Sequence, residues 1–298
     1  MQRIVLTGTN GQLGHEMMGR LSELGELHAF DRSTLDLTNT EQIRDIMRTL
    51  NPHIIVNAAA YTAVDRAEEE PEKARLVNAQ APRILAEEAK RCDALLVHYS
   101  TDYVFDGQGN KPWTEDQPTA PLSVYGETKR AGELAIAEVG CAHLIFRTSW
   151  VYGLHGANFV KTMLKLARER PQLSIIDDQI GAPTSAQVIS DISVKILRQG
   201  QHAFYKHFLE YSGIYNLVCN GETSWYGFAQ QIFSEARKCG EKLALQDVHA
   251  IPGSQYPTLA TRPMNSRLNT DKIRAAFDIK LPDWESSLAR CFPGILDK

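Results

Sequence analysis

The fold of this chain depends on one stretch near its start, Arg3-Ile4-Val5-Leu6-Thr7-Gly8-Thr9-Asn10-Gly11-Gln12-Leu13-Gly14. Its first five residues have the apolar, β-branched pattern of a short buried strand, and helix-compatible sequence follows to about Leu24. A strand, a glycine turn and a helix in this order bring together free N–H groups and the positive helix end, which suits a pyrophosphate. The spacing is G-x-x-G-x-x-G and not the standard G-x-G-x-x-G, so a plain tight turn is the alternative. The position of the turn favours dinucleotide binding, with Gly8 and Gly11 as candidate contacts.

The alternation of strand and helix continues outward from this stretch to about residue 150. Strand-like runs recur at residues 27–30, 53–56, 94–99 and 143–146, with helical sequence between them. The run at 94–99 is apolar except for His98, as is typical of a parallel sheet buried on both faces. We therefore predict an α/β protein in which residues 1–153 form an NAD(P)-binding domain with a Rossmann-type, doubly wound parallel sheet.

The alternation is looser in the second half. We expect helices at 159–169, up to about 198 and at 224–238, strand-like runs at 173–176 and 213–218, and a loop or frayed helix at 199–212. The segment around Pro252, Pro257 and Pro263 is irregular, which is typical of a binding lid. Residues 154–298 are predicted to be a smaller mixed α/β domain that mainly binds substrate, with some segments returning to the Rossmann sheet.

Composition excludes several classes of protein. The net charge of −4 gives no basis for binding nucleic acid or an acidic membrane surface. No apolar run approaches the roughly 20 residues that span a bilayer. The five cysteines are scattered and the nine histidines lack ligand spacing, so we expect a cytoplasmic protein with reduced thiols and no required metal.

A second nucleotide signal follows the strand at 27–30. Asp31, about 20 residues beyond the glycines, can accept hydrogen bonds from an adenosine ribose, whereas the neighbouring Arg32 could receive a 2′-phosphate. The pair indicates NADH or NADPH without choosing between them, and turn chemistry is the alternative for both residues. Asp36 would ordinarily be an N-cap or turn residue.

The most reactive pair of side chains is Tyr125 and Lys129, in the stretch Ser123-Val124-Tyr125-Gly126-Glu127-Thr128-Lys129. If a helix begins near Ser123, the two lie one turn apart on the same face. An ammonium beside a phenol favours the phenolate, so we expect the pKa of Tyr125 to be lowered toward neutrality. An ordinary surface helix pair is the alternative for these two residues taken alone.

The strand at 94–99 leads into Ser100-Thr101-Asp102-Tyr103-Val104-Phe105, at the edge where ligands bind in open α/β sheets. A glycine turn at residue 8, a threonine after this strand and Tyr-x-x-x-Lys beyond it resemble the extended short-chain dehydrogenase/reductase superfamily. Longer strings resemble its dTDP-4-dehydrorhamnose reductase family over nearly the whole chain: 98–105, 147–152 (Arg-Thr-Ser-Trp-Val-Tyr), 178–184 and 262–268.

The resemblance implies reduction of the C4 ketone of dTDP-4-dehydro-β-L-rhamnose to dTDP-L-rhamnose by NADPH or NADH. It implies cofactor contacts from Gly11, Gln12, Leu13, Asp31, Asp36, Leu37, Ala60, Tyr61, Thr62, Tyr125 and Lys129. It also implies that Thr101, Asp102 and Trp150 face the dTDP-sugar. Since guanidinium groups suit phosphates, we add Arg262 as a candidate contact for the substrate diphosphate; core packing for Trp150 and a surface position for Arg262 are the alternatives.

These residue types suit ketone reduction. The substrate oxygen gains negative charge as it receives a hydride, and Tyr125 is the natural acid to protonate it. Lys129 would stabilise the phenolate and hold the nicotinamide ribose. Thr101 would donate a hydrogen bond to the same oxygen.

Members of the family are described as holding magnesium between two subunits. Glu16 is available for such a site, but Gln187 stands where a carboxylate would be wanted, so we expect no metal and leave monomer or homodimer open. Two alternatives to the reductase remain. One is another nucleotide-sugar epimerase or dehydratase of the superfamily; the other is a non-catalytic regulatory subunit that binds NADP.

Overall fold

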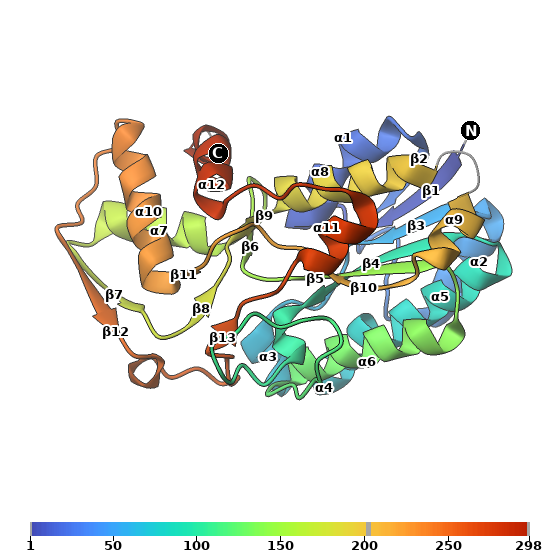
Figure 1. Cartoon of the computed structure of the whole chain (residues 1–298), viewed down its shortest axis with the longest axis horizontal. Helices are drawn as coiled ribbons and strands as arrows, with labels where there is room; N and C mark the ends of the chain where they lie inside the picture. The colour runs from blue at the N-terminus through green and yellow to red at the C-terminus, as the bar shows by residue number, and fades with distance from the viewer. Residues whose placement is uncertain (1, 201–203, 297–298) are drawn as a thin grey trace.

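A computed structural model describes residues 2–200 and 204–296 of the chain. Its main sheet has six parallel strands in the order β10-β5-β4-β3-β1-β2. Their bounds are β1 Gln2–Thr7, β2 Gly25–Phe30, β3 Ile54–Asn57, β4 Leu95–Thr101, β5 His143–Thr148 and β10 Gly213–Asn216. The predicted fold class, an α/β protein built on a doubly wound parallel sheet, is confirmed (Figure 1).

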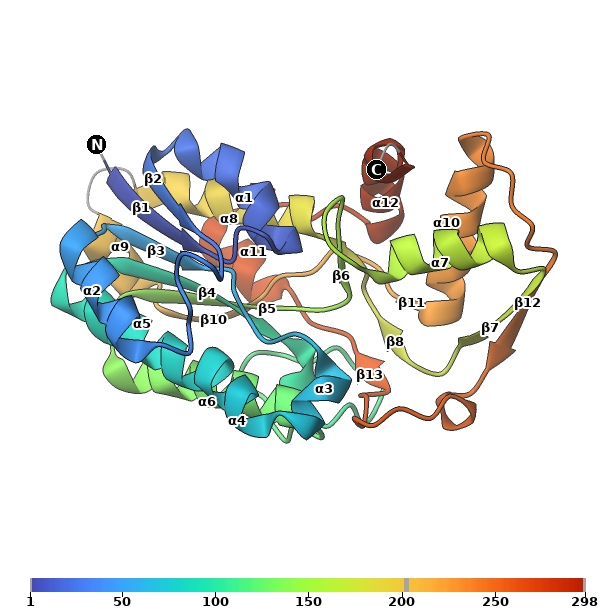
Figure 2. The same cartoon turned by 180° about the vertical axis from the view of Figure 1, so that it is seen from behind.

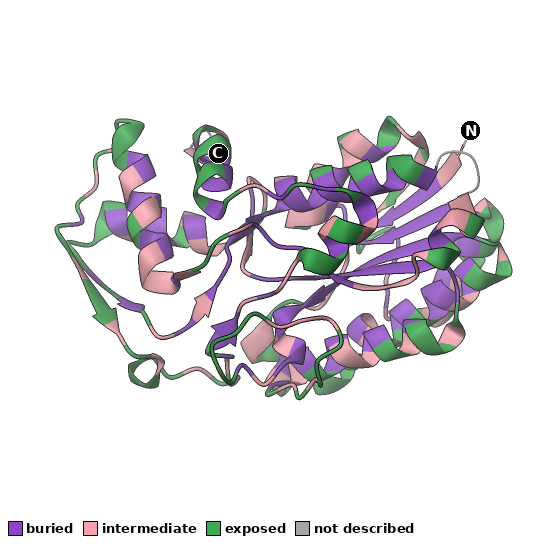
Figure 3. Ribbon diagram, in the orientation of Figure 1, coloured by how far each residue is buried: buried purple, intermediate pink, exposed green. Residues whose placement is uncertain are grey.

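Helices cover both faces of this sheet, α1 and α8 on one and α5 and α6 on the other (Figures 1 and 2). Those around the sheet are α1 Gln12–Ser22, α2 Thr40–Leu50, α5 Ala81–Arg91, α6 Val124–Val139, α8 Ala186–Leu197, α9 Phe204–Glu210 and α11 Asp271–Phe277. The strands at the centre of the sheet are buried, whereas the outer helix faces are exposed (Figure 3). The long apolar run at 94–99 is thereby explained, because β4 is covered on both sides.

A smaller body of helices and short strands lies beyond the ends of strands β4 and β5 (Figure 1). It contains α7 Phe159–Glu169, α10 Trp225–Lys238 and α12 Trp284–Leu296, and the parallel pair β7 Gln172–Ile176 and β12 Asp247–Ile251. Short strands complete it: β6 Val151–Tyr152, β8 Ile180–Gly181, β9 Thr184–Ser185, β11 Thr223–Ser224 and β13 Asn265–Ser266. The domain boundary at residue 153 remains a prediction, although β10 pairs with β5 in the main sheet.

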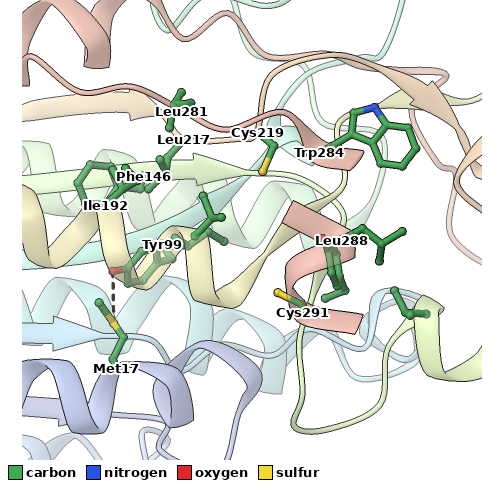
Figure 4. Packing of buried hydrophobic residues seen from close by; sticks show 14 of the residues in the cluster. Met17, Tyr99, Phe146, Ile192, Leu217, Cys219, Leu281, Trp284, Leu288 and Cys291 are labelled. Atoms are coloured by element: carbon green, nitrogen blue, oxygen red, sulfur yellow. Dashed lines mark hydrogen bonds between the residues drawn. The ribbon is translucent and has the colours of Figure 1, made fainter. Parts of the chain in front are cut away.

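One apolar core runs through both parts. Met17, Tyr99 and Phe146 of the Rossmann part belong to the same buried cluster as Trp284 and Leu288 of α12 (Figure 4). Tyr99 donates its hydroxyl to Ser193 at 2.8 Å, so the polar end of this large side chain is satisfied inside the core. The shared core means that the two parts are fixed against each other.

Most expected elements are present with small shifts at their ends. The helix at 159–169 matches α7, that at 224–238 matches α10 within one residue, and the strand at 213–218 is β10. In the helical sequence between the strands expected at 53–56 and 94–99, α4 Pro71–Arg75 and a π-helical segment at Leu76–Gln80 lead into α5. Of the loop or frayed helix at 199–212, residues 204–210 form α9 and 201–203 lie outside the described residues.

Backbone contact at the glycine turn is closer than other residues allow. Gly8 has φ +78°, and a Cβ there would lie 2.7 Å from the Ala59 nitrogen. A Cβ on Gly14, in the first turn of α1, would lie 2.1 Å from the Gly8 oxygen. These two positions therefore require glycine, one for its backbone angle and both for the close approach.

Candidate active site

A cleft of about 710 Å³ opens at the carboxyl ends of the parallel strands. The glycine turn, the end of β2, the segment after β3, the end of β4 and the start of α6 all contribute to it, together with residues from the smaller body. Sixteen of the seventeen residues predicted to bind or react line it: Gly8, Gly11, Gln12, Leu13, Asp31, Arg32, Asp36, Leu37, Ala60, Tyr61, Thr62, Thr101, Asp102, Tyr125, Lys129 and Trp150. The structure thus brings together residues up to 142 positions apart in the sequence.

Tyr125 and Lys129 lie in the first turns of α6. This helix begins where predicted, because the Ser123 hydroxyl caps it by accepting from the Gly126 amide at 3.2 Å. Lys129 is 1% exposed and its Nζ donates to the Tyr99 carbonyl oxygen at 2.5 Å. Burial lowers the pKa of Lys129 to about 8, against the opposing charge of Glu133 one turn on.

The expectation of a lowered tyrosine pKa is wrong for this geometry. Burial raises the pKa of Tyr125 to about 12, and a hydrogen bond with Thr101 opposes the rise only in part. The Lys129 ammonium does not offset burial, since Nζ is directed to Tyr99 and to His98. Tyr125 therefore carries its proton at neutral pH, as a general acid must before it acts.

Thr101 and Asp102 lie beside Tyr125 at the end of β4. The Thr101 hydroxyl donates to Asp102 Oδ1 at 3.1 Å and caps the short 3-10 turn at Asp102–Val104. Asp102 is 2% exposed, and burial raises its pKa to about 6. A carboxyl group that is partly protonated near neutral pH thus lies next to the proposed acid.

Asp31 is held in a turn at the exposed end of β2. Its Oδ1 accepts hydrogen bonds from the amides of Ser33 and Thr34, and its Oδ2 accepts from Asn10 at 2.9 Å. The Ser33 hydroxyl, which also binds Oδ1, is the main reason that the pKa of Asp31 is lowered to about 2. Asp31 therefore shapes the turn and also keeps a permanent negative charge at the rim of the cleft.

Trp150 adopts an unusual backbone conformation at the opposite side of the cleft. Its φ is +48°, in the left-handed region that a bulky residue seldom enters. Its ring stacks on that of Trp225 with centroids 3.7 Å apart and an angle of 12° between planes. Gly181 makes room for the ring, since a Cβ there would lie 2.8 Å from Trp150 Cε2. The stack on Trp225 and the close approach of Gly181 together fix the Trp150 ring at the cleft.

Arg262 is the predicted site residue that does not line the cleft. Its guanidinium pairs with Asp65 of α3 (Val64–Glu69) at 3.0 Å, and the other Asp65 oxygen accepts from the Ala260 amide at 3.1 Å. In this geometry Arg262 joins the proline-rich segment to α3. Its role as a diphosphate contact stays a proposal.

Several residues that line the cleft were not predicted. They are Lys73, Tyr103, Thr148, Ser149, Asn158 and Trp225, with others from the same segments. Thr148 ends β5, Ser149 follows it, and Tyr103 lies two residues beyond β4, so their position at a strand's carboxyl end could have indicated them. Asn158 and Trp225 begin or flank helices of the smaller body and carry no local signal.

Comparison with known proteins gives one consistent result. The family model described as RmlD substrate binding domain matches residues 1–295. The chain is 48% identical to the dTDP-4-dehydrorhamnose reductase of Escherichia coli (strain K12), covering 96% of each chain. The chain belongs to the dTDP-4-dehydrorhamnose reductase family.

Solved structures of this family superpose closely. A dTDP-4-dehydrorhamnose reductase from Bacillus anthracis, crystallised in complex with NADP, has a TM-score of 0.88, with 35% identity, 98% of this chain and 99% of that chain covered. One from Clostridium acetobutylicum has a TM-score of 0.89, with 34% identity, 99% of this chain and all of that chain covered. More distant neighbours, such as the UDP-glucose 4-epimerase of Thermus thermophilus at 18% identity, share the fold.

The residues present fit the dinucleotide that this family implies. The cleft side of Gly11 is open, because a Cβ there would meet only the Gly8 oxygen within 4 Å. Thr148 Oγ1 lines the cleft and is buried without a hydrogen-bond partner among the described residues, so it is available to a ligand. Backbone N–H groups at the start of α1 complete a donor set suited to phosphates.

Glu16 and Gln187, at the metal position described for members of the reductase family, contact other side chains in this structure. Glu16 pairs with Arg20 at 3.1 Å, and Gln187 Oε1 accepts from the Cys291 thiol at 3.3 Å. Within residues 2–200 and 204–296, no group of three or more His, Cys, Asp or Glu side chains is placed to hold a metal ion. The expectation that no metal is required remains a prediction.

Charge at the cleft rim predicts how cofactor preference responds to mutation. Asp31→Asn keeps the turn acceptor but removes the charge that repels a 2′-phosphate, so we expect the ratio of kcat/KM for NADPH over NADH to rise at least about tenfold. Arg32→Ala should lower the same ratio. Both cofactors should support activity in the unmodified protein, and a preference above about a thousandfold would contradict this interpretation. Steady-state kinetics with each cofactor measures the ratio.

Because Asp102 is buried, its replacement by asparagine should stabilise the fold by an amount that depends on pH. A raised carboxyl pKa stabilises the fold below about pH 4 and loses that contribution as pH rises through about 6. Asp102→Asn should therefore raise the free energy of unfolding at pH 8 by up to about 3 kcal/mol, and the gain should vanish near pH 4. Urea unfolding at both pH values tests this. Asp31→Asn, where the pKa is lowered, should show no gain; an equal gain in both variants would contradict the burial argument.

Proposed function

We propose that this protein reduces the C4 ketone of dTDP-4-dehydro-β-L-rhamnose to an alcohol, giving dTDP-L-rhamnose, with NADPH or NADH as the reductant. The observation that carries the proposal is that Thr101, Tyr125 and Lys129 line the same cleft as the glycine turn. The names of two relatives at 48% identity supply the substrate, since both are dTDP-4-dehydrorhamnose reductases.

When bound, the nicotinamide supplies the hydride. Tyr125 gives its proton to the ketone oxygen as negative charge develops there, and burial keeps that proton in place beforehand. Thr101, within hydrogen-bonding reach of Tyr125, donates to the same oxygen. Lys129 remains an ammonium below about pH 8 and stabilises the phenolate that the transfer leaves.

The remaining predicted residues divide between the two ligands. In this proposal the glycine turn, Asp31, Arg32 and the backbone after β3 hold the cofactor. Asp102 and Trp150 hold the dTDP-sugar, where Trp150 offers an aromatic edge backed by Trp225. The protein would act in the cytoplasm, as a monomer or homodimer, in making a nucleotide sugar for rhamnose-containing polymers, without nucleic acid or membrane as a partner. In the described part of the chain, no helix is both long and apolar enough to cross a membrane.

Two alternative functions make different demands on the site. A dehydratase needs further acid/base groups beside the threonine, but Asp102 is followed by Tyr103, whose ring stands edge to face with Tyr125 at 5.5 Å. An epimerase or dehydratase also retains its cofactor, so stoichiometric NAD in the purified protein would favour that class. A regulatory subunit would bind NADP and show no turnover.

The decisive experiment is a spectrophotometric assay of NADPH and NADH oxidation with enzymatically prepared dTDP-4-dehydrorhamnose. We expect turnover to depend on the dTDP-sugar, with about one cofactor oxidised per ketone reduced. Cofactor binding without oxidation would support the regulatory alternative and contradict the proposed reaction. Conversion of the sugar without net oxidation would support an epimerase or dehydratase.

A further inference from the structure

A row of buried polar side chains runs beneath the cleft and ends at Lys129. Thr7 on β1, Asn57 on β3 and His98 on β4 occupy matching positions on neighbouring strands. Thr7 Oγ1 lies 2.7 Å from Asn57 Oδ1, Asn57 Nδ2 lies 3.1 Å from His98 Nδ1, and His98 Nε2 lies 3.1 Å from Lys129 Nζ. All four residues are 1% exposed. Parallel register therefore builds one continuous hydrogen-bonded chain across three strands to α6.

In this row of hydrogen bonds, the choice of donor and acceptor in one bond fixes the choice in the others. With Asn57 Nδ2 facing His98 Nδ1, that nitrogen must accept, so a neutral imidazole carries its proton on Nε2. The Nε2–H then points at Lys129 Nζ, which can accept it only as a neutral amine. An ammonium at Lys129 would place two donors face to face at 3.1 Å.

Rotating the Asn57 amide by 180° gives the second consistent arrangement. Oδ1 then accepts from His98 Nδ1–H, Nδ2 donates to Thr7 Oγ1, and His98 Nε2 accepts from the Lys129 ammonium. The rotation exchanges two atoms of nearly equal size and needs no extra space. The Thr7 hydroxyl proton, released from Asn57, is then free to point toward the cleft that Thr7 lines.

We propose that His98 is a positioning residue for Lys129 and that the imidazole tautomer follows the charge of Lys129. His98 carries its proton on Nδ1 while Lys129 is an ammonium, and on Nε2 once Lys129 is an amine. Loss of one proton at Lys129 thus reverses every hydrogen bond from α6 to the strand that leads into the glycine turn.

Burial makes this exchange accessible near neutral pH. The pKa of His98 lies well below its usual value because burial, and then the Lys129 charge, oppose protonation, so the imidazole stays neutral. The Lys129 pKa of about 8 places the change close to neutral pH. Titration of Lys129, and not of His98, therefore determines which atoms donate and which accept along this row of hydrogen bonds.

The surrounding charges that bear on Lys129 are few. Glu133, one turn along α6, favours the ammonium, and Arg147 on β5 offsets it by binding both Glu133 oxygens at 2.8 and 2.7 Å. Tyr125 and Asp102 face the cleft side. Other charged groups bind elsewhere along α6: Glu68 of α3 at the Val124 amide, Arg83 of α5 at Glu138, Lys90 of α5 at the Val139 carbonyl, and Arg130 of α6 itself at Glu133.

The catalytic use of the hydrogen bond between His98 and Lys129 rests on the proposed function, but the test of that hydrogen bond does not. In the proposed reaction the Lys129 ammonium stabilises the Tyr125 phenolate, so an acceptor at His98 Nε2 keeps the required charge state. Activity should then fall above about pH 8 as Lys129 loses its proton. Both the tautomer and the Lys129 titration can be measured in the protein alone.

The first test reads the tautomer directly. In protein labelled with ¹⁵N-histidine, NMR shifts distinguish a protonated from an unprotonated ring nitrogen. We expect His98 to be protonated on Nδ1 at pH 6.5 and on Nε2 at pH 9.5. The same tautomer at both pH values would overturn the proposal, and no variant needs to fold for this result.

The second test uses two amide replacements that differ by one methylene group. His98→Gln places an amide near the Nε2 position and can still accept from Lys129; His98→Asn places it near Nδ1, where it reaches Asn57 but not Lys129. In protein labelled with ¹⁵Nζ-lysine, we expect the Lys129 pKa to stay within about 0.5 of the wild-type value in His98→Gln. It should be lower by about 1 to 2 in His98→Asn, because a hydrogen bond to the ammonium is lost.

Ser193→Ala provides the control for lost stability alone. It removes the buried hydrogen bond to Tyr99 at 2.8 Å, so it should destabilise the fold without moving the Lys129 titration. The high-pH limb of kcat/KM should shift with Lys129 in His98→Asn and stay in place in Ser193→Ala. Equal titration of Lys129 in both His98 variants would overturn the proposal. Inactivity of the wild-type protein toward the dTDP-sugar would contradict the proposed function and leave the NMR results standing.

Discussion

Replacing Tyr125 by phenylalanine is expected to lower kcat at least about a hundredfold while the protein stays folded and still binds its cofactor. The substitution removes only the hydroxyl, and the edge-to-face contact of the ring with Tyr103 can persist. A positioned general acid contributes roughly 10² to 10⁴ in rate, and no other group beside the substrate oxygen takes over that role in the proposed mechanism. NADPH oxidation with dTDP-4-dehydrorhamnose measures kcat, and quenching of protein fluorescence by NADPH measures binding.

Tyr152→Phe is the matched control for this prediction. Tyr152 is also buried, outside the cleft, and donates to Ser287 at 3.4 Å. Its loss should cost stability and leave kcat unchanged within about twofold. Near-normal turnover of the Tyr125→Phe enzyme would mean that the proton comes from another group.

The second large effect is expected from Gly14→Ala. A methyl group at this position would lie 2.1 Å from the Gly8 oxygen and 2.6 Å from the Gly8 carbon, both backbone atoms. Helix α1 or the glycine turn must move to relieve the overlap, which costs about 2 kcal/mol or more of stability. The turn would lose the geometry that suits a pyrophosphate, so we expect cofactor affinity to fall at least about thirtyfold. Isothermal titration with NADPH and urea unfolding measure the two effects.

Gly19→Ala, on the same helix, is the control. A Cβ at Gly19 meets nothing within 4 Å, so alanine should stabilise the helix by about 1 kcal/mol and leave cofactor affinity unchanged. If Gly14→Ala binds NADPH as tightly as Gly19→Ala does, the glycine turn does not hold the cofactor in the manner proposed.

Local sequence predicted the parts of the fold that depend on local pattern. The glycine turn, the apolar strands and the capped helix after Ser123 were identified because neighbouring residues create each of them. Strand β12 was missed because its residues are mostly intermediate or exposed and show little alternation. Helix α12 was missed in part because Pro293 lies inside it.

The site was predictable where a motif follows a strand. Thr101 falls in this group, since the carboxyl ends of parallel strands converge on one edge. Tyr125 and Lys129 were predictable instead from their spacing of four residues in a helix that Ser123 caps. Two features of the site could not be predicted from the spacing of residues in the sequence. Trp225 reaches the cleft through packing on Trp150, and Lys129 is directed to His98, 31 residues away, instead of lowering the pKa of Tyr125.

The position of β10 at the edge of the main sheet has a consequence for synthesis on the ribosome. Strand β5 borders only β4 until β10 arrives, and residues 149–212 lie between β5 and β10 in the chain. At typical elongation rates that interval lasts roughly 3 to 13 seconds. During it, the nascent sheet has a bare edge at β5, and until α8 is made it also lacks the side chains Ile189 and Ile192 of its core. A chaperone that shields apolar edges would therefore be most useful to this protein between the emergence of β5 and that of β10.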